Sequence, residues 1–256
     1  MNNSPIDIDK LIEGTNEILT ANRNSLQLFD MLHSMRQFDD LTYVHSVNVA
    51  LIASILGQWL KFSEKDIRIL TISGLLHDIG KIMIPNEILT KPGKLTVAEY
   101  NIMKQHVNFG YEKVKNQNID IRIKEACLLH HEKCDGTGYP FGLKSDHIPA
   151  VAKIIAIADV YDAMTSARVY RGALCPFEVI DTMYKDAFTK FEPEYILPFL
   201  KNVASSYINN DVRLSDGRIG KVVLINENAL SLPIVQCEDE FIDLSKTRGL
   251  TVSAIL

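Results

Sequence analysis

Residues 75–81 read LLHDIGK, a stretch that ends a helical pattern with a histidine and an aspartate side by side. Upstream, apolar residues recur at helical spacing from a capped start at Ser63. We therefore expect a helix that carries His77 and Asp78 at its C-terminal end, with Gly80 as its stop. Imidazole nitrogen and carboxylate oxygen both bind divalent metals, so this pair marks a candidate metal site.

A second segment, HHEKCDGTGYP at residues 130–140, has two adjacent histidines at the end of a helix predicted over about 121–132. Its glycines and its proline predict a tight loop, because glycine tolerates positive φ and proline cannot continue a helix. Two simpler interpretations stay open. His130 and His131 could be a polar helix end that interacts with the helix dipole, and the loop could merely reverse the chain.

The remaining pattern is helical up to about residue 210 and then changes character. Further predicted helices cover about 6–33, a segment that carries His45, a segment that starts at Thr96 and carries His106, residues 150–166 with Asp159, and segments after Pro176 and Pro193. Beyond these, two β-prone runs flank Asp216-Gly217, and LPIVQC and FIDL follow as short strands. We predict a mainly α protein with an N-terminal helical segment (1–38), a helical domain (39–210) and a small C-terminal β subdomain (211–256).

Composition narrows the class of protein. The chain has 256 residues and a net charge of −5, which argues against a nucleic-acid polymer as partner. None of its four cysteines forms a C-x-x-C pair, and we interpret them as the reduced thiols of a cytosolic protein. The N-terminus lacks the pattern of a signal peptide. The most apolar stretch, Val44 to Leu60, is too short and too polar to span a membrane and favours a buried amphipathic helix. We expect a cytoplasmic protein.

The candidate metal ligands are five histidines at the ends or in the early turns of predicted helices, together with two aspartates: His45, His77, Asp78, His106, His130, His131 and Asp159. Asp78 is the best bridging candidate, since two carboxylate oxygens can hold two ions about 3.5–4 Å apart. Such a pair can bind both non-ester oxygens of a phosphodiester and activate water for in-line attack. A single histidine is more often structural than a ligand, but five of the seven histidines share this pattern.

The two segments together resemble the paired signatures of the HD-GYP phosphodiesterases, within the HD superfamily of metal-dependent phosphohydrolases. The resemblance spans about residues 40–205 and includes ADVYDAMTSARVYR at 158–171. It implies an HD-type all-helical bundle. It also implies an enzyme that hydrolyses cyclic di-GMP to linear pGpG at a binuclear metal centre, in bacterial second-messenger signalling.

The resemblance also implies roles at matching positions. One metal would take His45, His77, Asp78 and Asp159, and the other would take Asp78, His106, His130 and His131. Asp78 and Lys81 would be the catalytic residues, with the Lys81 cation beside the phosphate. Substrate contacts would come from Lys81, Arg168, Arg171 and Tyr139. Alternatively, the two arginines form a solvated helix end, and the 135–140 loop contacts a signalling protein.

The chain departs from the family at Leu41, where some members carry a glutamate that binds a third metal. We therefore expect two divalent ions, with iron or manganese favoured and zinc, nickel or cobalt compatible, and no efficient conversion of pGpG to GMP. Two other functions stay open: a phosphodiesterase for another cyclic dinucleotide such as cyclic GMP-AMP, and a non-catalytic ligand-binding signalling module. The N-terminal helix could pack on the core, pair two subunits into a homodimer or receive a signal.

Overall fold

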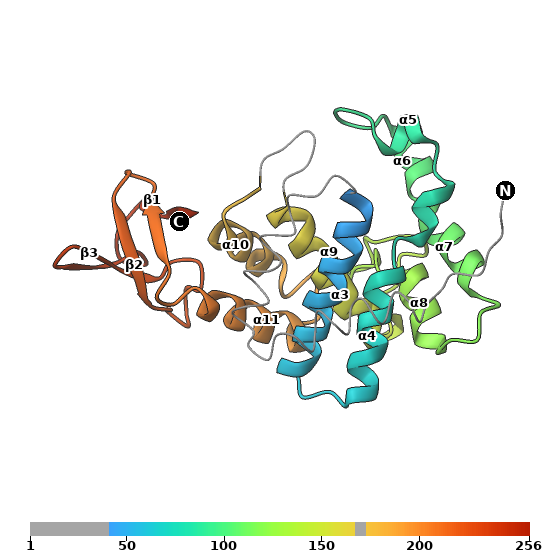
Figure 1. Cartoon of the computed structure of the whole chain (residues 1–256), viewed down its shortest axis with the longest axis horizontal. Helices are drawn as coiled ribbons and strands as arrows, with labels where there is room; N and C mark the ends of the chain where they lie inside the picture. The colour runs from blue at the N-terminus through green and yellow to red at the C-terminus, as the bar shows by residue number, and fades with distance from the viewer. Residues whose placement is uncertain (1–40, 167–172) are drawn as a thin grey trace.

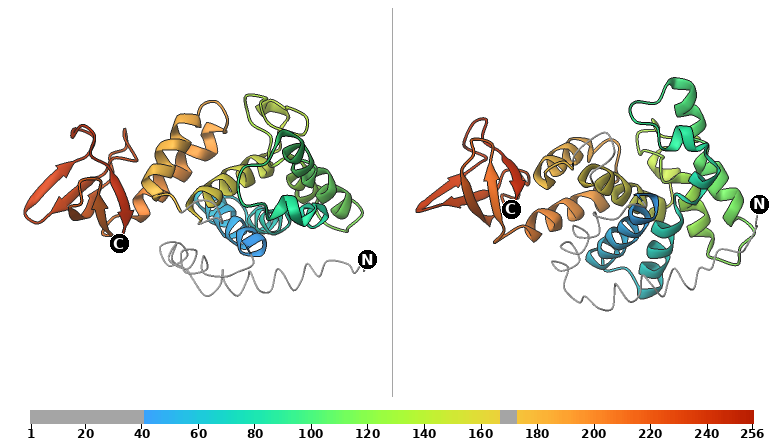
Figure 2. Two further views of the ribbon diagram at one scale, coloured as in Figure 1. Left: turned by 90° about the horizontal axis from the view of Figure 1, so that it is seen from above. Right: turned by 45° about the horizontal axis from the view of Figure 1, so that its top comes forward.

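The computed structural model describes residues 41–166 and 173–256, so the helical segment predicted for residues 1–38 lies outside the described residues. The described chain forms a helical body followed by a small antiparallel sheet (Figure 1), and both remain distinct in two further views (Figure 2). Its helices are α3 (Leu41–Trp59), α4 (Glu64–Leu76), η1 (Ile79–Met83), α5 (Asn86–Leu89), α6 (Val97–Met103), α7 (His106–Val114), α8 (Ile121–Leu129), η2 (Ser145–His147), α9 (Ala150–Thr165), α10 (Pro176–Asp186) and α11 (Pro193–Ser206), where η denotes a 3-10 helix. The predicted fold class, mainly α with a small C-terminal β subdomain, is confirmed.

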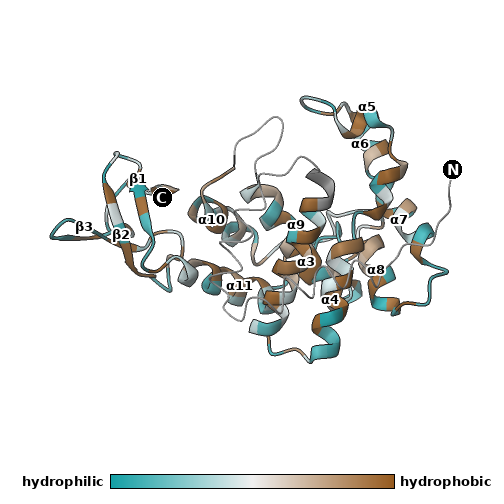
Figure 3. Cartoon of the chain, in the orientation of Figure 1, coloured by the Kyte–Doolittle hydropathy of each residue, from teal (hydrophilic) through white to brown (hydrophobic). Residues whose placement is uncertain are grey.

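Helix α3 forms the centre of the helical body. It packs against α4, α9 and α11, and every residue from His45 to Gly57 is buried. Hydrophobic residues dominate this helix (Figure 3). The helix and its burial are therefore as predicted, but the helix is not amphipathic, because it has no solvent-exposed face along this stretch. The polar residues within it, among them His45 and Asn48, must then find partners inside the protein.

The starts of α4 and α6 lie where the sequence predicts them, whereas two predicted helix ends are wrong. The Ser63 hydroxyl caps α4, and Thr96 with Glu99 forms a capping box at the start of α6. Gly80 was wrongly predicted as a helix stop, because α4 ends at Leu76 and η1 then runs through Gly80. The single helix predicted to run from Thr96 through His106 is split, since α6 ends at Met103 and α7 begins at His106.

The C-terminal sheet is antiparallel throughout, with strand order β4-β3-β2-β1-β5. Its strands are β1 (Asp211–Leu214), β2 (Ile219–Leu224), β3 (Ile234–Cys237), β4 (Glu240–Asp243) and β5 (Val252–Ile255). The hairpin predicted at Asp216-Gly217 joins β1 to β2, while β5 was not predicted. Buried Val212 and Val222 belong to the same core cluster as Phe177 of α10 and Phe199 of α11, so the sheet packs on the last helices.

None of the helices in residues 41–166 and 173–256 has the length and hydropathy that a membrane span requires.

Candidate metal centre

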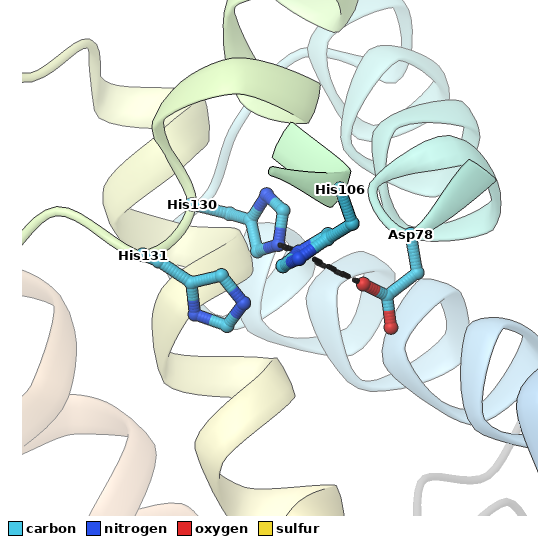
Figure 4. Close-up of side chains that lie close together, drawn as sticks. All are labelled: Asp78, His106, His130 and His131. Carbon is cyan, nitrogen blue, oxygen red and sulfur yellow. Dashed lines mark hydrogen bonds and ion pairs between the residues drawn. The ribbon is translucent and has the colours of Figure 1, made fainter. Parts of the chain in front are cut away.

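The seven predicted ligands come together in the helical body. His45 lies in α3, His77 and Asp78 follow α4, His106 begins α7, His130 and His131 follow α8, and Asp159 lies in α9. The ligands form two groups, and within each group the ligand atoms all lie within 4.8 Å of one another. One group is Asp78, His106, His130 and His131, and the other is His45, His77 and Asp159. Figure 4 shows the first group, whose side chains from three parts of the chain point toward a common centre. Elements far apart in sequence therefore build one compact cluster.

Asp78 lies between the two groups. Its Oδ2 atom is 3.6 Å from Nε2 of His45 and 3.3 Å from Nε2 of His77. Its Oδ1 atom is 3.3 Å from Nε2 of His106 and 3.9 Å from Nε2 of His130. Each oxygen thus faces a different set of histidines, which is the arrangement that a carboxylate bridging two metal ions requires.

Four of the histidine rings are held so that Nε2 points into the cluster, namely those of His45, His77, His106 and His130. In three of them Nδ1 lies within hydrogen-bond distance of a backbone carbonyl about one turn earlier, and a carbonyl can only accept. These pairs are His77 with Gly74 at 2.7 Å, His106 with Met103 at 2.8 Å and His130 with Ala126 at 3.0 Å. Nδ1 therefore carries the proton, and Nε2 presents a lone pair suited to a metal.

Burial keeps most of these histidines neutral. It lowers the pKa of His106, lowers that of His130 well below the usual range, and lowers that of His131 to about 4. Burial would also lower the pKa of His45, but hydrogen bonds with Asp159 and Asp162 outweigh it and raise that pKa to about 9. Without a metal, His45 is therefore protonated at neutral pH, with Nε2 3.0 Å from an oxygen of Asp159.

The two aspartates carry negative charge into a buried site. Burial opposes their ionisation, yet Lys81 and His77 hold the pKa of Asp78 well below its usual range. A hydrogen bond from His45 does the same for Asp159. Lys81 lies on η1, three residues after Asp78, and its Nζ is 2.5 Å from Oδ2 of that residue. The cluster therefore combines two carboxylates and five imidazoles with an adjacent ammonium group.

These donors fit a divalent metal. Nε2 of His106 and Nε2 of His130 are 3.4 Å apart, and both face Oδ1 of Asp78, so lone pairs converge on one point. Among the described residues, Oδ1 of Asp78 and Nε2 of His77 are buried without a hydrogen-bond partner. A buried polar atom without a partner costs about 1–3 kcal/mol, which a bound cation would offset. Nitrogen and carboxylate donors in this number suit divalent transition metals.

The 135–140 loop packs against the cluster. Glu132 is buried, and its two carboxylate oxygens accept hydrogen bonds from the backbone nitrogens of Phe141 (2.7 Å) and Leu143 (2.9 Å). The Tyr139 ring stacks on the His131 ring, with centroids 4.7 Å apart and an interplanar angle of 29°. Gly138 passes so close to the backbone that a Cβ there would lie 2.4 Å from Cα of Glu132. The loop therefore does more than reverse the chain, because it covers one of the predicted ligands.

Some predicted residues lie outside the described chain, and two important ones were not predicted. Arg168 and Arg171 lie outside the described residues, and Leu41 begins α3 one turn before His45. Glu132 and Asp162 were not predicted from the sequence. Asp162 accepts a hydrogen bond from Nδ1 of His45 at 2.7 Å. A second aspartate three residues after Asp159 in an otherwise apolar helix was the available signal, since this spacing places both on one face.

Comparison with known proteins places the chain in a family. The chain belongs to the HD domain family, whose model matches residues 13–195. A cyclic di-GMP phosphodiesterase of Pseudomonas aeruginosa is 36% identical over 203 residues, which cover 79% of this chain and 49% of that protein. A 3′3′-cGAMP-specific phosphodiesterase of Vibrio cholerae is 36% identical over 173 residues, which cover 66% of this chain and 38% of that protein. These matches confirm the resemblance to HD-GYP phosphodiesterases.

The chain spans about half the length of the curated relatives it matches. Among solved structures, an HDG"Y"P protein from Bdellovibrio bacteriovorus superposes with a TM-score of 0.60 at 19% identity, covering 77% of this chain and 64% of that one. At this identity the likeness concerns the fold, and it agrees with the HD-type helical architecture described above.

Proposed function

We propose that this chain is a metal-dependent phosphodiesterase that hydrolyses cyclic di-GMP to linear pGpG in bacterial second-messenger signalling. One observation carries the proposal: the oxygens of Asp78 face different histidine groups, and Lys81 lies beside the same carboxylate. The name of the Pseudomonas relative supports the choice of substrate. The reaction class follows from the donors, because two adjacent divalent ions suit the displacement of an ester oxygen from phosphorus.

The proposed centre holds two divalent ions, with iron or manganese favoured and zinc, nickel or cobalt compatible with the same donors. One ion would be held by His45, His77, Asp78 and Asp159, and the other by Asp78, His106, His130 and His131. When bound, the ions supply Lewis-acid charge for the phosphate and lower the pKa of water. We propose two ions rather than three because Leu41, one turn before His45, offers no ligand atom. For the same reason we propose pGpG as the end product.

The chain's own groups would orient the substrate and balance its charge. Lys81 carries three N–H donors on a side chain that is 21% exposed, so it can reach a phosphate oxygen at the edge of the cluster. There its charge would stabilise the negative charge that develops in the transition state. His77, His106 and His130 keep their Nδ1 protons on backbone carbonyls, so their task is to hold position rather than to transfer protons.

Substrate contacts beyond the cluster belong to the same proposal. Tyr139 stacks on His131 and offers an aromatic face beside the reacting phosphate. Arg168 and Arg171 would hold phosphate oxygens, in keeping with the affinity of guanidinium groups for phosphate. A signalling protein could also contact the 135–140 loop, and residues 1–38 could pair two chains.

A second substrate has a specific observation in its favour. The Vibrio relative is named as specific for 3′3′-cGAMP, and the metal-ligating groups described here would contact phosphate rather than the bases. These groups therefore suit either cyclic dinucleotide. Side-by-side turnover of cyclic di-GMP and cyclic GMP-AMP by the same preparation separates the two substrates. Tight binding of either without any product would instead favour a non-catalytic signalling module.

The test of the proposed function is Asp78→Ala, which removes the carboxylate between the two groups. We expect turnover of cyclic di-GMP to be abolished and the metal content of the purified chain to fall. Asp181→Ala on α10 is the matched control, because this half-exposed aspartate pairs with Lys185 and Ser231 and not with the cluster, so its loss should leave both quantities unchanged. Full activity of Asp78→Ala, with metal content unchanged, would refute the proposal.

A further inference from the structure

Asp162 connects a predicted ligand to the end of α9. It is buried, with 2% of its surface exposed, and it receives hydrogen bonds on both oxygens. Oδ2 accepts from Nδ1 of His45 at 2.7 Å. Oδ1 accepts from Nδ2 of Asn48 at 2.9 Å and from Oγ of Ser166 at 3.0 Å. Asn48 lies on α3 three residues after His45, so the carboxylate ties two side chains of the central helix to α9.

We propose that Asp162 is a positioning residue that holds the proton of His45 on Nδ1, so that Nε2 is free to bind a metal ion. This inference rests on the proposed metal centre and assigns a role that the ligands alone do not require. His77, His106 and His130 obtain the same orientation from backbone carbonyls. His45 obtains it from a side chain, so this one ligand can be altered by a substitution that leaves every ligand atom in place.

The position of the proton on His45 decides whether the ring can ligate. Nε2 lies 3.0 Å from Oδ1 of Asp159 and 3.6 Å from Oδ2 of Asp78, so it points directly into the candidate ligand set. A proton retained on Nε2 would occupy the lone pair that a metal needs. Groups that orient a metal-binding histidine in this way typically change metal affinity by about 10–100-fold when they are replaced.

Asp162→Asn should move that proton while preserving shape. The amide oxygen of the new side chain will favour the Oδ1 position, where Asn48 and Ser166 both donate. Its NH2 group will then face Nδ1 of His45, and two donors cannot share one hydrogen bond. The ring must present its lone pair there and carry its proton on Nε2. We therefore expect the apparent affinity for Mn²⁺ to fall by about 10–100-fold.

A reciprocal exchange should restore the site. In Asn48→Asp combined with Asp162→Asn, the amide nitrogen of residue 162 can donate to the new carboxylate on α3. Its amide oxygen is then left for the Nδ1 proton of His45. The hydroxyl of Ser166 can rotate to accept instead of donating. The exchange keeps the net charge and the composition of the site, so a return of Mn²⁺ affinity would follow from hydrogen-bond direction rather than from charge or volume.

The experiment titrates Mn²⁺ alone into four versions of the 256-residue chain by calorimetry: unaltered, Asp162→Asn, the Asn48→Asp/Asp162→Asn exchange, and Ser166→Ala as the matched control. Ser166→Ala removes one hydrogen bond to Asp162 without touching His45, so its affinity should stay within about twofold of the unaltered chain, well short of the loss from a displaced ligand. Long-range ¹H–¹⁵N spectra of the Zn²⁺-loaded chains report directly which imidazole nitrogen carries the proton. We expect Nδ1–H for His45 in the unaltered and exchanged chains.

Several results would overturn the inference. Equal Mn²⁺ affinity in Asp162→Asn and the unaltered chain would do so, as would an exchanged chain that folds yet stays as weak as Asp162→Asn. If Asp162→Asn does not fold, the exchanged chain still decides, because only a directional role predicts native affinity in it. An unaltered chain that binds no Mn²⁺ would overturn the metal centre itself, which distinguishes that failure from failure of the role of Asp162.

Discussion

Replacing Gly80 with alanine tests the packing that places Asp78 and Lys81 against His106. A Cβ at Gly80 would lie 1.9 Å from the carbonyl oxygen of His106 and 2.4 Å from the backbone nitrogen of Gly110. Both atoms belong to the backbone of α7, so no side-chain rotation can relieve the collision. Since non-bonded carbon atoms pack at about 3.5–4.0 Å, η1 and α7 would have to separate by roughly 1.5 Å.

The separation should affect both stability and activity. Overpacking a well-packed interior costs about 1–3 kcal/mol, and a collision between two backbones belongs at the upper end. For a chain of this length each kcal/mol shifts Tm by about 2–4 °C, so Tm should fall by about 6–12 °C. Oδ1 of Asp78 and Nε2 of His106 are 3.3 Å apart, and a displacement of about 1 Å at such a site can lower turnover by about 100-fold.

The control is Gly110→Ala, on the opposite side of the same contact. A Cβ there would meet nothing closer than 3.4 Å, which is ordinary van der Waals contact. Alanine is also favoured over glycine inside a helix by about 0.5–1 kcal/mol, so Tm should hold or rise slightly. Both variants are compared by calorimetric unfolding, metal content and cyclic di-GMP turnover. If Gly80→Ala shows the Tm, metal content and turnover of Gly110→Ala, the close contact between η1 and α7 does not position the site.

Three further predictions concern the site. Lys81→Met should lower kcat for cyclic di-GMP by about 10²–10³-fold while metal content stays native, because it removes a stabilising charge beside the phosphate. Steady-state kinetics that show only a raised KM would contradict this. Glu132→Gln should lower the free energy of unfolding by about 1–3 kcal/mol, since the NH2 group that replaces one oxygen faces the backbone N–H of Phe141 or Leu143 and cannot accept from it. Denaturant titration measures this change. Although burial opposes it, hydrogen bonds with Asp159 and Asp162 raise the pKa of His45 to about 9, so metal entry near pH 7 should displace a proton. Metal affinity should then rise about tenfold per pH unit towards pH 9, and calorimetry that finds no proton release would contradict it.

Features with local causes could be predicted from the sequence. Ser63 and Thr96 cap their helices through residues three positions on, so the starts of α4 and α6 were visible in the pattern. The hairpin at Asp216-Gly217 depends on a turn that its own residues favour, with Gly217 at a φ of 94°. Adjacent pairs such as His130 and His131 could also be recognised in the sequence as candidate ligands. The resemblance to a family then supplied the more distant members of the cluster.

Features that depend on distant contacts could not be predicted in this way. Gly80 looked like a helix stop, whereas its small size serves the approach of η1 to His106, 26 positions along the chain. The role of Asp162 could not be predicted either, because its hydrogen-bond partner His45 is 117 residues away in the sequence. The strand β5 pairs with β1 across some forty residues, and its four residues carry little signal alone. In each case tertiary packing decides the role of a residue whose neighbours in sequence are uninformative.

We expect this cluster to cleave a cyclic dinucleotide with two metal ions. The most direct test is chromatographic identification of the product formed from cyclic di-GMP by the anaerobically purified chain, with metal equivalents counted in the same sample. We expect two equivalents of metal and pGpG as the end product. Absence of any product from a chain that holds two equivalents, or a third equivalent with GMP as the main product, would contradict it.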